Sequence, residues 1–80
     1  MAKQYRNEKL IQAVGHYLRQ LREERGLSQE KVTFQKNIYL TRIENGYRDI
    51  TLNTLMRLCD AYQITLRDFF KGLNYEQAGD

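Results

Sequence analysis

The two stretches that decide the fold are LREERGLSQE at residues 21–30 and TRIENG at residues 41–46. Gly26 is the residue type that most often follows the last turn of a helix, because glycine adopts the left-handed conformation without strain. Ser28 is a favoured N-cap, and Gly46 repeats the stop signal. The spacing therefore predicts a helix that ends near Gly26, a second that starts at Ser28, and a third that ends before Gly46.

Apolar residues at helical spacing extend this pattern in both directions. Such residues share one face of a helix, which is typical of an element that packs on a core. Thr51 and Thr65 are suitable N-caps for two further helices. We therefore expect five helices, over about residues 8–25, 28–35, 37–45, 51–62 and 65–73. The expected core consists of Leu10, Val14, Leu18, Leu21, Val32, Leu40, Ile43, Leu52, Leu55, Leu58, Cys59 and Phe69.

The predicted fold class is all-α, because no segment shows the two-residue alternation of a strand. Eighty residues leave room for a single core. We expect one domain over residues 8–73, preceded by a flexible arm over residues 1–7 and followed by a polar tail over residues 74–80.

The composition is that of a globular protein, with 41% hydrophobic and 29% charged residues. The chain has one cysteine, Cys59, so an internal disulfide is impossible. No apolar run approaches the roughly 20 residues that a membrane span needs. These features predict a soluble, cytoplasmic protein that makes no use of a membrane.

Positive charge is concentrated in the first part of the chain. Residues 1–48 hold 10 Lys/Arg and 5 Asp/Glu, whereas residues 49–80 hold 3 and 5. A basic half suits a polyanionic partner, but a solvated surface explains it equally well. The single histidine, His16, has no nucleophile, carboxylate pair or metal-ligand spacing beside it. We therefore expect no enzymatic activity, no catalytic residue, no metal and no cofactor.

The two opening stretches, taken together, resemble the phage repressor and Cro-like helix-turn-helix family, the xenobiotic-response-element (XRE) type. The resemblance spans about residues 14–73 and implies a compact five-helix, lambda-repressor-like DNA-binding domain. It implies a transcriptional regulator that reads double-stranded DNA as a homodimer on a palindromic site, with the third helix in the major groove. One feature departs from the family. The connection between Gln29 and Arg42 is about three residues shorter than usual, and Lys36-Asn37 replaces the glycine that many relatives carry there.

The third helix supplies the expected base contacts. Winding residues 36–45 as a helix turns Ile38 and Arg42 outward, with Tyr39 beside them. The guanidinium of Arg42 matches a guanine edge. Ile38 suits a thymine methyl group or a corner of the core, and Tyr39 suits a base, a phosphate or the helix surface. Asn37 corresponds by resemblance to a contact position, but its place at the helix start also suits an N-cap.

The expected phosphate contacts surround this helix, and each has an alternative as ordinary loop or cap chemistry. They are Gln29, Lys36, Asn45, Tyr47, Arg48, Thr51 and Asn53. By resemblance, Gln29 holds either a phosphate or a neighbouring side chain. The resemblance also implies that Arg22 and Glu44 form a structural ion pair between the first and third helices.

The last helix carries more large apolar groups than its share of a small core requires. We expect the surplus, Phe70, Leu73 and Tyr75, to form a dimer interface, or to pack under the tail instead. A second class of function also fits the residues. The same fold serves as a protein-interaction module, such as an antitoxin-like domain that docks a partner protein and binds DNA only secondarily.

Overall fold

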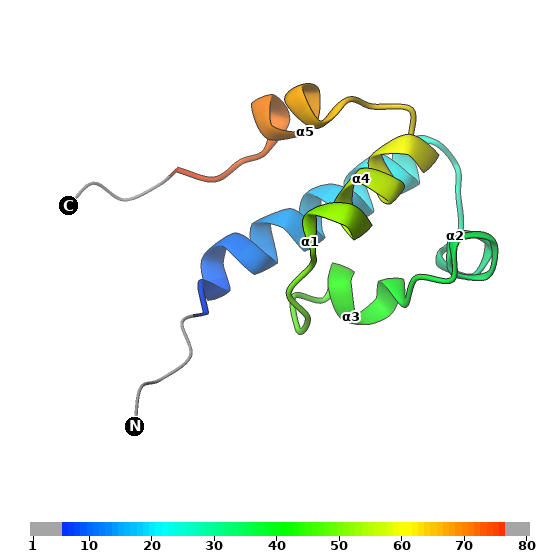
Figure 1. The fold of residues 1–80 in the computed structure, drawn as a ribbon, viewed down its shortest axis with the longest axis horizontal. Coiled ribbons are helices and arrows are strands. Elements are labelled where there is room, and N and C mark those ends of the chain that lie inside the picture. Colours follow the sequence, from blue (N-terminus) through cyan, green and yellow to red (C-terminus); the bar gives the residue numbers. More distant parts are fainter. Residues whose placement is uncertain (1–5, 77–80) are drawn as a thin grey trace.

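The computed structural model describes residues 6–76, and within this range the chain forms five α-helices and no strand (Figure 1). The helices are α1 (Glu8–Glu24), α2 (Gln29–Lys36), α3 (Leu40–Glu44), α4 (Leu52–Ala61) and α5 (Leu66–Gly72). The predicted all-α, five-helix fold is thus confirmed. In this described range no helix is both long and apolar enough to cross a membrane.

Short-range capping contacts explain where most of the helices begin. The side chains of Ser28, Thr51 and Thr65 each accept a hydrogen bond from the backbone N–H three residues later, as expected. Asn7 does the same for α1 and was not predicted as a cap. Gly26 follows α1 with a φ of +66°, in the left-handed region. These helix boundaries are therefore set by local chemistry.

The core lies between α1, α4 and α5, and α2 and α3 close it from one side (Figure 1). Its wholly buried side chains are Leu18, Leu40, Leu58, Cys59, Tyr62 and Phe69. Burial raises the pKa of the Cys59 thiol. Leu10 packs at the edge of this core. The expectation that Leu52 belongs to it is wrong, since the residue is 72% exposed. Leu52 is the first residue of α4, and helical side chains point back toward the N-terminus, so it projects beyond the packed layer.

A glycine lets α1 and α3 approach closely. A Cβ atom on Gly15 would lie 2.2 Å from the carbonyl oxygen of Ile43, which no side chain can tolerate. Gly46 has a φ of +76° and lies against Gln12 of α1. Together the two glycines allow α3 and the turn after it to rest directly on the backbone of α1.

The segment after α5 turns back toward the start of α1. The Nδ2 atom of Asn7 donates to the hydroxyl of Tyr75 at 2.8 Å, so the chain at this point is held against the domain. Leu73 is half-buried against the core. The expected surplus of apolar groups therefore reduces to Phe70, which is 50% exposed. Residues 1–5 and 77–80 of the expected arm and tail lie outside the described residues.

Candidate nucleic-acid interface

The connection between α2 and α3 is a tight three-residue turn. Asn37 ends α2 in the left-handed conformation, with φ 56° and ψ 43°, and its N–H donates to the carbonyl of Thr33 at 2.8 Å. Asn37 is therefore the C-cap of α2, and its expected role as an N-cap of the next helix is wrong. Asparagine tolerates this conformation better than most residues, so it replaces the missing glycine. Arg57 of α4 also donates to the carbonyl of Lys36 at the end of α2.

The shortened connection also moves the start of the third helix. We expected a helix over about 37–45, whereas α3 covers only Leu40–Glu44 and has no side-chain cap. The chain must change direction between α2 and α3 within three residues. Residues 37–39 therefore form the connection and cannot also form the first turn of the third helix. This connection carries Ile38 inward to 5% exposure. The expected contact of Ile38 with a thymine methyl group is therefore wrong, and its alternative, a corner of the core, is what the structure contains.

The outward side of α3 carries polar and aromatic groups. Tyr39, just before the helix, is 61% exposed, and Thr41, Arg42 and Asn45 are also exposed. Lys36 is half-buried at the end of α2. A major groove admits one helix and presents hydrogen-bonding base edges to it. Tyr39 and Arg42 are thus accessible from the outward side of α3.

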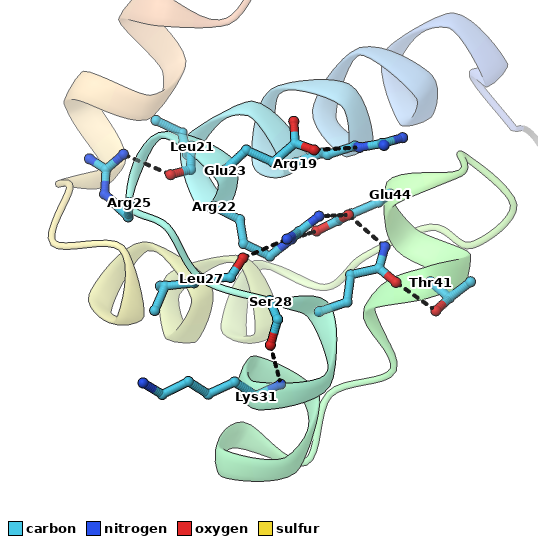
Figure 2. Close-up of polar contacts among 11 residues, drawn as sticks. Arg19, Leu21, Arg22, Glu23, Arg25, Leu27, Ser28, Lys31, Thr41 and Glu44 are labelled. Atoms are coloured by element: carbon cyan, nitrogen blue, oxygen red, sulfur yellow. Dashed lines mark hydrogen bonds and ion pairs between the residues drawn. The ribbon is translucent and has the colours of Figure 1, made fainter.

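A buried polar frame fixes α3 on α1 (Figure 2). The guanidinium of Arg22 donates twice to the carboxylate of Glu44, at 2.8 and 3.0 Å, and once to the carbonyl of Leu27 at 2.6 Å. The Arg22 and Glu44 side chains are 8% and 1% exposed. The hydrogen bonds that Arg22 donates to Glu44 raise the pKa of the Arg22 guanidinium, so this group stays charged although it is buried. The paired charges tie the end of α1 to the end of α3.

Gln29 extends this frame to the surface. Its Nε2 atom donates to Glu44 at 2.8 Å, and its Oε1 atom accepts from the hydroxyl of Thr41 at 3.2 Å. The side chain therefore holds two neighbouring side chains, which is one of the two roles expected for it. The first turn of α2 and the outward side of α3 are thus fixed relative to each other.

The loop after α3 contains most of the other expected phosphate contacts. Tyr47 is 72% exposed, and Arg48 and Asn53 are also exposed. The hydroxyl of Thr51 already caps α4 by accepting from the N–H of Thr54. The N–H groups of Tyr47 and Arg48 both donate to the carbonyl of Arg42, at 2.9 and 3.3 Å, so the loop folds back on α3.

Two arginines at this surface were not predicted from the sequence. Arg6 donates to the carbonyl of Tyr47, 41 residues away, and Arg57 donates to Lys36. No spacing rule connects positions so far apart, and the cluster of positive charge in residues 1–48 is the only signal that included Arg6. Within residues 6–76, no group of three or more His, Cys, Asp or Glu side chains is arranged to hold a metal ion.

Residues 18–69, most of the chain, match the family model described as helix-turn-helix. The chain belongs to the helix-turn-helix family, of the XRE and Cro type. The resemblance carried by the two opening stretches is therefore confirmed. The matched residues include all of α2, α3 and α4, together with the end of α1 and the first residues of α5.

One curated relative and two solved structures are similar to this helix-turn-helix protein. The chain is 36% identical over 61 residues to the HTH-type transcriptional regulator DdrOP3 of Deinococcus deserti, across 72% of this chain and 47% of the relative. The chain thus spans about half the length of that relative.

The restriction-modification controller protein C.AhdI from Aeromonas hydrophila is 32% identical with a TM-score of 0.71, over 78% of this chain and 98% of the other. The controller protein C.Esp1396I, solved as a tetramer with its natural 35 base-pair operator, is 24% identical with a TM-score of 0.73. That match covers 81% of this chain and 90% of the other, and it bears on the fold alone.

Proposed function

We propose that this helix-turn-helix protein is a transcriptional regulator that binds a short specific sequence of double-stranded DNA, with α3 in the major groove. The observation that carries the proposal is the rigid presentation of α3. Arg42 is exposed on α3 and Tyr39 is exposed just before it, and the opposite side of this helix is fixed on α1 through Glu44 and at Gly15. Direct readout requires donors held at a defined angle to the base edges. In this role the protein acts in the cytoplasm.

The contacts divide into two groups. The first group reads base edges and consists of Arg42 and Tyr39, with Asn37 as a further base contact from the turn before α3. The backbone contacts come from Lys36, Asn45, Tyr47, Arg48 and Asn53, together with the first turns of α2 at Gln29 and of α4 at Thr51. Phosphate contacts set the register of the protein on the duplex, whereas base contacts supply the specificity.

We further propose that the protein binds as a homodimer through α5. Phe70 is half exposed on α5, whereas Phe69 beside it is wholly buried, and a two-fold axis next to Phe70 would pair the same patch on both protomers. The exposed ring packs edge-on against the buried Phe69 at a centroid distance of 5.5 Å, so it is already oriented. In this proposal the half-buried Leu73 and Tyr75 add to the interface that Phe70 forms.

Two arginine variants test the proposal because they separate base reading from phosphate binding. The site is first selected from random duplex DNA, and affinities are then measured by fluorescence anisotropy on that site and on an unrelated duplex. Arg42→Ala is expected to cost about 1–3 kcal/mol on the selected site and much less on the unrelated one. Arg48→Ala is expected to weaken both equally and to lower the log–log salt slope by about one per protomer.

The outcomes distinguish the possible functions. Equal losses on both duplexes for Arg42→Ala would assign Arg42 to the backbone and give base reading to Tyr39 or Lys36. A wild-type protein with no salt-dependent affinity for any duplex would contradict DNA binding altogether. That result would favour the protein-docking function, because docking of a protein releases few counterions.

A further inference from the structure

A hollow beside α3 brings together residues from three separate parts of the chain. It is lined by Arg6, Arg42, Tyr47, Arg48 and Asp49. Arg42 comes from α3, Arg6 from the segment before α1, and the others from the loop between α3 and α4. Three guanidinium groups thus surround one concave surface at the edge of the proposed DNA interface.

Arg6 is held in place at this hollow by two contacts. Its Nε atom donates to the carboxylate of Glu8 at 2.6 Å, and its Nη2 atom donates to the carbonyl of Tyr47 at 2.9 Å. An arginine has five N–H donors. The other three N–H groups of Arg6 have no partner among residues 6–76. A positioned cation with unused donors is therefore present where a phosphate would approach.

We propose that this hollow binds one phosphodiester group of the DNA backbone, and that Arg6 supplies a principal charge of the site. The inference rests on the proposed function and adds to it the segment before α1, which none of the expected contacts included. Guanidinium groups match the oxygens of a phosphate with paired N–H donors, and such charge-assisted bonds are stronger than neutral ones. The hydrogen bond to the carbonyl of Tyr47 places Arg6 beside the loop that carries Arg48.

Two carboxylates reduce the positive charge of the hollow without cancelling it. Glu8 pairs with Arg6, and Asp49 accepts a hydrogen bond from the N–H of Ile50 at 2.8 Å. Three guanidinium groups still outnumber them. The Asp49→Asn variant keeps an oxygen for that hydrogen bond but removes a negative charge, so it is expected to bind duplex DNA several-fold more tightly.

A matched pair of arginine variants tests the site. Arg6 and Arg19 are both exposed and both pair with a glutamate, and Arg19 lies on α1 outside the hollow. Arg6→Ala is expected to weaken binding to all duplexes and to lower the log–log salt slope by about one per protomer. Arg19→Ala removes the same charge and is expected to leave the slope unchanged. Equal slopes for the two variants, with the wild type still binding DNA, would overturn the site but not the proposed function.

A chemical change in the DNA locates the phosphate. Methylphosphonate groups, which carry no charge, replace one backbone phosphate at a time in the selected duplex. We expect one position per half-site at which the wild type loses clearly more affinity than Arg6→Ala, since Arg48 still faces the phosphate in the variant. Absence of any such position would overturn the inference. So would an Arg6→Ala variant that loses affinity only for inorganic phosphate, measured by NMR titration, since the hollow would then be a site for the free ion.

Discussion

The part of the molecule built from α1, α4 and α5 differs from the part built from α2 and α3 in what holds it together. The first part contributes most of the wholly buried side chains, among them Leu58 and Phe69. In the second, α2 buries only Val32 and leaves Phe34 89% exposed. α3 buries Leu40 and Ile43, but its orientation depends in addition on the ion pair between Arg22 of α1 and Glu44 and on the hydrogen bonds around it.

This difference separates stability from orientation. Burial of apolar surface is strong but non-directional, so it holds helices together without fixing a side chain at a particular angle. Hydrogen bonds and ion pairs are directional and lose strength steeply with misalignment. The part built from α2 and α3 therefore needs polar contacts to orient its side chains, even where these contacts add little net stability. Each of the following predictions tests one side of this comparison.

The largest effect is expected from breaking the ion pair on one side. Glu44→Leu leaves Arg22 charged and buried without its partner, which should cost about 3–5 kcal/mol in the free energy of unfolding. The measurement is urea denaturation followed by circular dichroism. Glu23→Leu is the matched control, because Glu23 pairs with Arg19 on the surface and its side chain is 55% exposed. That variant should change stability by less than about 1 kcal/mol.

The double variant Arg22→Met with Glu44→Leu sharpens this result. Apolar replacements on both sides remove the unpaired charge, so most of the lost stability should return. Affinity for the selected duplex should not return, since Gln29 would still lack the carboxylate that orients it. A double variant as unstable as Glu44→Leu, or one with wild-type affinity for DNA, would contradict the separation of stability from orientation.

Two leucines of α4 give the next contrast. Leu58 is wholly buried, and Leu58→Ala should cost about 2–5 kcal/mol because it removes packed methyl groups and leaves a cavity. Leu52 is 72% exposed, and Leu52→Ala should change the free energy of unfolding by no more than about 0.5 kcal/mol. Urea denaturation measures both. Similar losses for the two variants would mean that Leu52 packs as the sequence pattern predicted.

A smaller stabilising effect is expected at Tyr62, whose hydroxyl lies in the apolar core. Its side chain is wholly buried, and its hydroxyl has no hydrogen-bond partner among residues 6–76. A buried unsatisfied hydroxyl is destabilising. Tyr62→Phe should therefore raise the free energy of unfolding by about 1 kcal/mol at pH 7, measured in urea.

The pH dependence of this pair gives a second measurement. Burial raises the pKa of Tyr62 to about 12, whereas an exposed tyrosine has a pKa of about 10. Between these values the unfolded chain has released the proton and the folded chain retains it, so stability falls as the pH rises from about 10 to about 12. The loss from this group should approach about 3 kcal/mol. Tyr62→Phe should lack this part of the loss, and an identical alkaline slope would show that Tyr62 does not titrate in this way.

Local signals in the sequence predicted the order of the helices and most of their boundaries. The caps at Ser28, Thr51 and Thr65 and the glycines at 26 and 46 act within a few residues, so their effects can be read without a fold. The family resemblance likewise depended on short stretches. Most of the expected core positions followed from the same local periodicity. Among the exceptions are Leu52, the first residue of α4, which is exposed, and Tyr62, which is wholly buried but was not among the expected core residues.

The sequence by itself thus determined five helices, their apolar stripes and the family to which they belong. Only the tertiary structure decided that Ile38 turns inward, that α3 begins at Leu40, and that Arg6 lies beside the loop after α3. Each of these features depends on contacts between segments far apart in the chain, or on a turn squeezed between two packed helices. Periodicity and capping describe a helix along its own axis, and they carry no information about the neighbour against which it packs.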